Sequence, residues 1–415
     1  MNNKLHLVAL ALLASLFVAC SSSDKTPQTV KSNNRTVLIY IAAANTLGYL
    51  GLDNDDLKEM EQGLALVDEA DLELANISVY REYSSSSTRS APELLKLERK
   101  GDDIFWKKLK DYDAQISTDK KVMSEVFNFV YSSFKADTYG LILWSHADGW
   151  LYGGHDRWSK DTRWFGQDID GNKKFYMDIP DLAKALEVAP HLDFILFDAC
   201  FMQSIEVAYE LQGVADYMLG SAMEIPGPGA PYQELIPLFF QKEKSIAYDI
   251  ADAYYGYYDK KYNGGLNSSN SNWTSGVSMG VLDLKFIESF TQTTLSVLKA
   301  NGLKYTDLDF SNVMYYDKQD EDRRQKYYYM DMKGVMKKNI KVGYAEWERS
   351  FNKLLPFYKT THTNFSFFAS NIVMDNSFGL SFYVPRKEIP GYYTFKKENA
   401  YYEKLGWAKR MLAPF

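Results

Sequence analysis

Apolar runs recur along the first half of the chain and predict β-strands that are covered on both faces. They are rich in β-branched and aromatic residues, which is typical of strands buried inside a parallel sheet. These runs lie at 35–44, 74–83, 139–144, 194–197 and 216–219. Segments with helical spacing separate them, at 53–66, 120–134, 178–188 and 202–211. Asp178 and Pro180 suit the start of the third of these helices, as N-cap and first-turn residue.

The alternation of strands and helices predicts an α/β fold with a mostly parallel sheet flanked by helices. A short segment at 93–98 adds one antiparallel strand. After Gly227-Pro228-Gly229 the pattern changes to an α+β character, with a helix at 246–258 and strands at 276–284 and 379–384. We therefore predict a core at 35–230 and a C-terminal region at 231–415 that packs on it.

The first 34 residues differ from the rest. An apolar run at 5–19 follows Lys4 and is too short to span a bilayer comfortably. Its end, Ala19-Cys20, resembles the lipobox of bacterial lipoproteins. That resemblance implies a signal peptide at 1–20, lipidation of the Cys20 thiol and a polar tether at 21–34. The predicted location is the cell envelope, with membrane attachment through Cys20 and the outer membrane or cell surface favoured. A plain secretory signal is the alternative.

Cysteine content then singles out Cys200. The chain has two cysteines, so lipidation of Cys20 leaves Cys200 as the free thiol of the mature protein, with no disulfide. The net charge of −7 and the lack of a basic stripe argue against nucleic acid as a partner. The 46% of hydrophobic residues can form a large core without disulfides.

Two of the predicted strands end in reactive side chains. His146 follows the 139–144 run, and Asp198 and Cys200 follow the 194–197 run. Ligands bind outside the carboxyl ends of parallel strands, and neighbouring strands would bring His146 and Cys200 to one edge. There the imidazole could deprotonate the thiol or hold it as a thiolate. The dipole of the helix predicted from 202 would favour the thiolate, and backbone N–H groups after His146 and at Cys200 could form an oxyanion hole.

Several segments resemble the clostripain family of cysteine peptidases, which are relatives of caspases. They are LILWSHADGW at 141–150, FDACFMQSIEVAYEL at 197–211, SAMEIPGPGAPY at 221–232 and, more loosely, GLSFYVP at 379–385. The resemblance implies a caspase-like fold and an endopeptidase acting on proteins or peptides, and the predicted signal peptide makes it an exported one. It also implies a His146/Cys200 catalytic dyad, with Asp198 lining the pocket for a basic side chain.

Two positions depart from the family pattern. Ala147 stands where the family usually has glycine, and it still offers its N–H to a substrate carbonyl. Pro228 stands where members specific for basic residues place a second acid, and Glu224 is the nearest carboxylate. A preference for Arg or Lys therefore stays open. Asp198 has an alternative interpretation as the N-cap of the helix that follows it.

Family members can be cut into two chains that stay together. In this sequence the corresponding stretch carries three basic residues in a predicted exposed loop, at Arg157, Lys160 and Arg163. We take them as candidate self-cleavage sites.

Two other functions remain as alternatives. The 31 Tyr and 8 Trp residues are also typical of surface lipoproteins that capture glycans, so a binding protein on a degenerate peptidase fold is the first. The second is a metal-dependent hydrolase built on His146 and His155, although their spacing, with Asp148 and Asp156, fits no metal motif. No metal site is predicted. Calcium dependence occurs in the family, and the acidic stretches 53–56 and 168–172 are its candidates here. The sequence leaves the oligomeric state open.

Overall fold

A computed structural model gives the structure of the protein. It describes residues 33–85, 88–89, 91–151, 165–264, 274–317, 327–366, 370–388 and 394–413. The part from Asn33 to Phe415 forms one compact unit.

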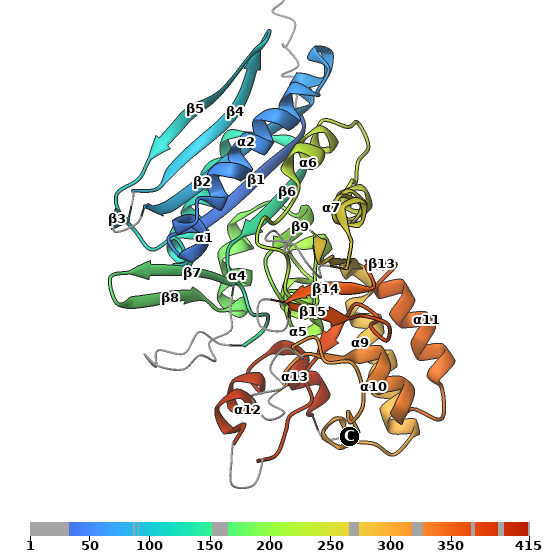
Figure 1. Ribbon diagram of the computed structural model, residues 1–415. Helices are drawn as coiled ribbons and strands as arrows, with labels where there is room; N and C mark the ends of the chain where they lie inside the picture. The colour runs from blue at the N-terminus through green and yellow to red at the C-terminus, as the bar shows by residue number, and fades with distance from the viewer. Residues whose placement is uncertain are drawn as a thin grey trace, which may run out of the picture. The chain divides into compact units, whose positions relative to one another are not determined.

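A ten-stranded sheet is the centre of this unit (Figure 1). Its order is β13 (Phe357–Thr360), β11 (Ser278–Asp283), β10 (Ala215–Gly220), β9 (Leu192–Asp198), β6 (Ala136–Trp144), β1 (Asn33–Ala43), β2 (Ala75–Ser85), β4 (Glu93–Lys100) and β5 (Asp103–Asp111), with β3 (Thr88–Arg89) paired to β2. The five strands from β10 to β2 in this order run parallel, and the outer strands are antiparallel. The predicted α/β class with a mostly parallel sheet is confirmed.

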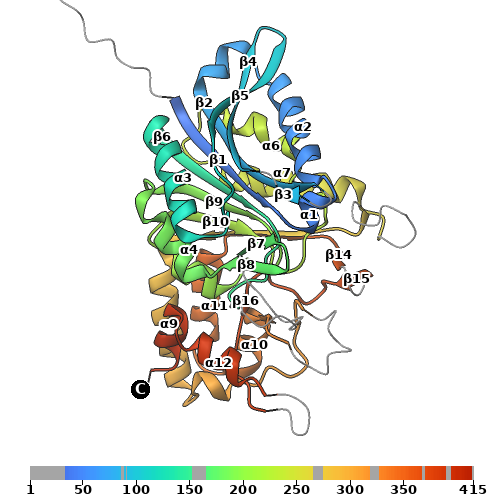
Figure 2. The ribbon, with the colours of Figure 1, turned by 90° about the vertical axis from the view of Figure 1, so that its left-hand side faces the viewer.

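Helices cover both faces of the sheet, as the uninterrupted apolar strands require. Along β1, Leu38 and Tyr40 belong to one hydrophobic core, and Ile39 and Ile41 to the other, because successive side chains point to opposite faces. The first core is covered by α3 (Lys120–Ser133), α4 (Ile179–Ala185) and α5 (Ile205–Leu211). The second is covered by α2 (Leu52–Ala65), α6 (Tyr232–Phe239) and α7 (Ala247–Lys261), on the opposite side of the sheet (Figure 2).

Smaller elements complete the unit. In the first half they are α1 (Thr46–Tyr49), η1 (Glu69–Leu74), the hairpin of β7 (Phe165–Asp170) and β8 (Lys173–Met177), and η2 (Leu186–Val188). In the second half they are η3 (Leu284–Phe286), α9 (Ile287–Ala300), η4 (Tyr305–Asp307), β12 (Met330–Asp331), α10 (Met332–Asn339), α11 (Tyr344–Leu354), β14 (Thr363–Ser366), β15 (Ser370–Val373), β16 (Ser381–Phe382), α12 (Lys396–Tyr402) and α13 (Gly406–Met411).

The second half of the chain is bound tightly to the segment that carries Cys200. Strands β11 and β13 extend the same sheet, and β16 lies against the residues that follow the cysteine. The Ser381 N–H donates to the Gln203 carbonyl (3.1 Å), and the Tyr383 N–H donates to the buried carboxylate of Glu206 (2.8 Å). The C-terminal residues therefore support the segment that follows Cys200.

Eight strands among the described residues were not predicted, namely β3, β5, β7, β8 and the four from β12 to β15. β5 is an edge strand whose sequence, DIFWKKLKD, is mostly exposed and lysine-rich, a composition that protects an edge against aggregation but hides its strand character. β7 and β8 form a hairpin that turns at Gly171, where φ is +60°, within a segment rich in Asp and Lys. The predicted strand at 379–384 is reduced to the two residues of β16.

Candidate active site

The site is built at the carboxyl ends of β6 and β9. These strands are neighbours in the sheet and parallel, and their last paired residues are Trp144 and Asp198. His146 and Cys200 each follow two residues after this pair. The register of the two strands therefore places both side chains at the same edge of the sheet, despite their separation in sequence.

The imidazole of His146 is half-buried and hydrogen-bonded. Its Nε2 lies 2.7 Å from Oγ1 of Thr46. Burial lowers the pKa of His146 to about 4, and the positive charge of Lys174 adds to the effect. The ring is therefore neutral at pH 7, in the form that can accept a proton.

Cys200 is a free thiol that packs against both hydrophobic cores. Its Sγ accepts a long hydrogen bond from the Ile225 N–H (3.5 Å). Burial raises the pKa of Cys200, and the negative charge of Glu224 raises it further. The thiol is therefore protonated at pH 7 in the free protein.

The prediction that a helix begins at Met202 is wrong by three residues. Helix α5 begins at Ile205, and its N-cap is Ser204, whose hydroxyl accepts from the Val207 N–H. Cys200 and Phe201 lie in a turn, and Met202 and Gln203 belong to neither a helix nor a strand. The helix dipole acts over the first turn only, so it does not lower the pKa of the thiol.

An unusual backbone follows the cysteine. Phe201 has a φ of +60°, a conformation that costs a non-glycine residue about 1–2 kcal/mol. Its N–H donates to the Met223 carbonyl (2.8 Å), and its ring stacks on that of Tyr329 with centroids 4.9 Å apart. The Tyr329 hydroxyl in turn donates to the backbone carbonyl of Asp148. One tyrosine of the C-terminal region thus contacts the loops of both His146 and Cys200.

Two backbone N–H groups beside the reactive side chains have no acceptor among the described residues. Ala147 forms an isolated bridge with Phe165, in which the Gly166 N–H donates to the His146 carbonyl (2.9 Å). Among the described residues, no acceptor is bound to the N–H of Ala147 or of Cys200. Ala147 does not belong to the described residues with positive φ, so its methyl group causes no backbone strain. These N–H groups are available to an oxyanion.

Comparison with known proteins agrees with this geometry. A model of the clostripain family matches residues 39–410 of the chain. The chain belongs to the clostripain family. The predicted family is thereby confirmed.

Similarity to individual members extends over most of the unit. A secreted C11 cysteine protease from Bacteroides thetaiotaomicron, solved with an irreversible peptide inhibitor, is 36% identical, with a TM-score of 0.78 over 91% of this chain and 99% of that one. An inactive zymogen C11 protease from Parabacteroides distasonis is 27% identical, with a TM-score of 0.73 over 92% and 99% of the two chains. Clostripain from Hathewaya histolytica is 26% identical over 225 residues, which are 49% of this chain and 42% of that protein. The matched region thus spans less than half the length of that curated relative. These relatives support the predicted enzyme class, a cysteine endopeptidase.

Within this clostripain-family site, Asp198 is a buried acceptor rather than an exposed charge. Its side chain is 3% exposed, and it accepts hydrogen bonds from the Ala230 N–H (3.0 Å), the Tyr232 hydroxyl (3.2 Å) and the Tyr254 hydroxyl (3.1 Å). Burial raises the pKa of Asp198 to about 6. Because Ser204 is the N-cap of α5, the alternative role of Asp198 as a helix cap is wrong.

The backbone after Glu224 passes close to the Asp198 carboxylate at Gly229. Gly229 has a φ of +70°, and a Cβ there would lie 2.9 Å from Oδ2 of Asp198. Only glycine allows this approach. Glu224 itself is 7% exposed and close enough to Cys200 for its charge to raise the thiol pKa. Pro228 is half-buried.

Some predicted residues lie outside the described part of the chain. They are the lipidation candidate Cys20, the self-cleavage candidates Arg157, Lys160 and Arg163, and the metal-ligand candidates His155 and Asp156. No helix in the described ranges has the length and apolar character needed to cross a membrane.

The described residues include both acidic stretches that were candidates for calcium. No group of three or more His, Cys, Asp or Glu side chains among them is arranged to hold a metal. In the two acidic stretches, Asp53 forms an ion pair with Arg81 (3.5 Å), and Asp168 accepts from the Ser117 N–H (2.6 Å). No step of the chemistry below uses calcium.

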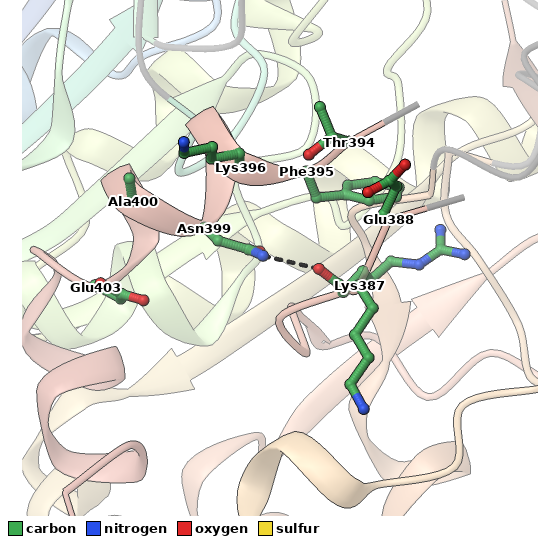
Figure 3. A pocket seen from close by; sticks show the side chains of 9 residues that line it. Lys387, Glu388, Thr394, Phe395, Lys396, Asn399, Ala400 and Glu403 are labelled. Carbon is green, nitrogen blue, oxygen red and sulfur yellow. Dashed lines mark hydrogen bonds between the residues drawn. The ribbon is translucent and has the colours of Figure 1, made fainter. Parts of the chain in front are cut away.

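A separate hollow of about 520 Å³ lies in the C-terminal region (Figure 3). Asn399 lines it and donates to the Arg386 carbonyl (2.8 Å). Its charged lining residues have both signs and include Lys387, Lys396 and Glu403. It includes neither His146 nor Cys200.

Sequence reasoning missed two residues that contact the site. Thr46 follows the strand at 35–44, so the rule that ligands bind at strand ends could have indicated it if β1 had been placed beside β6. Tyr329 lies in a Tyr-rich stretch, and no local signal distinguishes it from its neighbours.

The pKa shifts predict slow alkylation of Cys200 at neutral pH. In a Cys20→Ser variant, which keeps Cys200 as its one thiol, we expect iodoacetamide at pH 7 to react at least about 10-fold more slowly with the folded chain than with the urea-unfolded chain. The reason is that burial raises the thiol pKa above its ordinary value of about 8.5. The folded rate should rise as the pH increases into the alkaline range. A plateau between pH 5 and 8 that disappears in His146→Ala would instead indicate a thiolate–imidazolium pair.

Proposed function

We propose that this protein is a cysteine endopeptidase in which Cys200 is the nucleophile and His146 the general base. The observation that carries this proposal is the position of both side chains two residues beyond the paired residues Trp144 and Asp198 of neighbouring parallel strands. Membership of the clostripain family supports the same chemistry.

The reaction begins from a neutral pair. His146 takes the thiol proton as Sγ of Cys200 attacks the peptide carbonyl carbon. The N–H groups of Ala147 and Cys200 stabilise the oxyanion of the tetrahedral intermediate. His146 then donates its proton to the leaving amine, and the C–N bond breaks. Water, deprotonated by the same imidazole, hydrolyses the thioester and restores the thiol.

A preference for Arg or Lys before the cleaved bond is part of the proposal. The charges of Glu224, Asp148 and Asp198 all act on the Cys200 thiol and raise its pKa, so the surroundings of the nucleophile are negative. A basic side chain would be attracted to them.

A mixed peptide library tests both the endopeptidase activity and the preference for Arg or Lys. We expect a variant lacking residues 1–20 to cut the library, and mass spectrometry to find mostly Arg or Lys before each cut. Cuts after other residues would support the peptidase function and contradict the preference for Arg or Lys. An absence of cuts, with and without calcium and after limited trypsin treatment to remove any blocking segment, would favour a binding lipoprotein.

Self-cleavage at Arg157, Lys160 or Arg163 is a further part of the proposal. A relative of known structure is described as an inactive zymogen, which supports activation by processing in this family. We expect intact-mass analysis to find two fragments of the wild-type protein and one uncut chain of Cys200→Ala. A single uncut chain in both samples would reject self-cleavage.

We also propose that the mature protein is exported and attached to a membrane by a lipid on Cys20. One relative is described as secreted, and the apolar run before Cys20 supports export. Labelling cells with an alkyne fatty acid should mark the wild type and leave Cys20→Ser unmarked. Equal labelling of both would reject the anchor.

A further inference from the structure

A third strand end contributes to the candidate site. Strand β1 lies between β2 and β6 and runs parallel to both, so its carboxyl end reaches the same edge as His146. The chain turns there into the short helix α1, with Asn45 as N-cap and Thr46 as first residue. Two adjacent residues after β1 thus meet two adjacent residues after β6. Asn45 Nδ2 donates to Ser145 Oγ (3.2 Å), and Thr46 Oγ1 lies 2.7 Å from His146 Nε2.

The first of these contacts holds α1 in place. Asn45 is 3% exposed, its Oδ1 accepts from the Leu47 N–H (2.9 Å), and its Nδ2 also donates to the carbonyls of Ala42 and Gln167 (both 2.8 Å). Ser145 Oγ donates to the same Ala42 carbonyl (2.8 Å). The carboxyl ends of β1 and β6 are therefore joined through one buried hydrogen-bond network.

The helix is also pressed closely against β1. A Cβ at Gly48 would lie 2.0 Å from the Ala43 carbonyl oxygen, so only glycine permits this approach. The Gly48 position and the Asn45 network together leave little freedom for the backbone of Thr46. Its hydroxyl is consequently aimed at the His146 ring, although Thr46 itself is exposed.

The contact has a consequence for proton transfer. Because Nε2 is bound to Thr46, Nδ1 is the nitrogen left to take a proton from the thiol. A threonine hydroxyl can accept as well as donate. When Nε2–H donates to Thr46 Oγ1, the lone pair is on Nδ1, which is the tautomer that a general base requires. After proton transfer the imidazolium keeps the same Nε2–H···Oγ1 bond, so the ring does not have to turn between the two steps.

We propose that Thr46 is a positioning residue for His146, holding the ring through Nε2 in the tautomer whose Nδ1 accepts the Cys200 proton. This proposal rests on the proposed peptidase function. Thr46 acts through the imidazole and does not touch the reacting atoms. Because its hydroxyl is at the solvent boundary and water can partly replace it, its effect should be smaller than that of a fully buried orienting group, which reaches about 10⁴-fold in kcat.

Kinetics of Thr46 variants test the proposal. In Thr46→Val, which keeps the shape and removes the hydroxyl, we expect kcat to fall about 10- to 100-fold with KM unchanged within about two-fold. Thr46→Ser, which restores a hydroxyl, should recover most of the rate. Thr293→Val is the matched control, because the Thr293 hydroxyl donates only to the Ser289 carbonyl within α9 (2.9 Å), and it should leave kcat unchanged. A wild-type kcat in Thr46→Val would overturn the positioning role while leaving the peptidase function intact.

The tautomer can be measured without any activity. In protein with ¹⁵N-labelled histidine, long-range ¹H–¹⁵N spectra should assign His146 to the Nε2–H tautomer, with the signal identified by its absence in His146→Gln. Thr46→Val should shift it toward a mixture of tautomers, and Thr46→Ser should not. An Nδ1–H tautomer in the wild type, or the same spectrum in Thr46→Val, would overturn the proposal even if no substrate were found.

Discussion

Replacing Cys200 with alanine is expected to abolish peptide cleavage, with kcat falling on the order of 10⁴-fold or more. The substitution removes the sulfur that attacks the carbonyl, and no other thiol is present in a variant that also lacks residues 1–20. The measurement is kcat on a peptide cut by the wild type. The variant should stay folded, because the thiol makes a single long hydrogen bond (3.5 Å).

Histidine variants supply the control for this result. His146→Ala should lose on the order of 10³-fold or more in kcat, and the double variant should be no worse than Cys200→Ala, since the two groups act as a unit. His191 precedes β9 at the opposite edge of the sheet, where it is exposed and bonded to Asp216 (2.9 Å). His191→Ala should therefore keep wild-type activity. Full activity in His146→Ala would reject the dyad.

Replacing Asp198 with alanine is expected to lower the free energy of unfolding by about 3–5 kcal/mol. The carboxylate is the acceptor for three donors, the Ala230 N–H and the hydroxyls of Tyr232 and Tyr254. Its loss leaves these buried groups without that partner, and each such group costs about 1–3 kcal/mol. Denaturant unfolding of inactive Cys200→Ala protein, with and without the substitution, measures the change without self-digestion.

Tyr254→Phe is the matched variant for this network. It removes one donor and keeps the ring, so it should cost about 1 kcal/mol. Combined with Asp198→Ala it should cost less than the sum of the two, because the hydroxyl left without an acceptor is then absent. If Asp198→Ala changes only the residue preferred before the cut and leaves stability within about 0.5 kcal/mol of the parent, Asp198 is a pocket residue and not a structural acceptor.

The strand ends were predictable from sequence to different degrees. His146 and Cys200 follow short apolar runs that are recognisable as buried strands, so the position of each reactive group at a strand end could be deduced locally. The start of α5 could not, because Met202 and Gln203 continue a helical pattern while the structure uses Ser204 as the cap. Tertiary contacts decide that boundary, since the Gln203 carbonyl accepts from the Ser381 N–H across the chain.

The hydrogen-bond partners of Asp198 could be identified only from the structure, for a similar reason. Its spacing from Cys200 indicates a pocket or a cap; the Ser204 N-cap rules out the cap, and the pocket stays a prediction. The structure turns it toward tyrosines of α6 and α7, more than thirty residues later in the chain. No local pattern indicates those partners.

The sequence by itself determined the alternation of buried strands and helices and the position of His146 and Cys200 at strand ends, because burial and strand ends are encoded in local apolar runs. Its motifs carried the resemblance to the clostripain family, which the family model confirms. Only the tertiary structure decided which groups hold that pair. Thr46 reaches His146 because β1 and β6 are neighbours in the sheet, and Tyr329 stacks on Phe201 because the C-terminal region folds back over both loops. Such contacts depend on strand order and chain packing over a hundred residues of sequence or more, which the local pattern of apolar and polar positions does not specify.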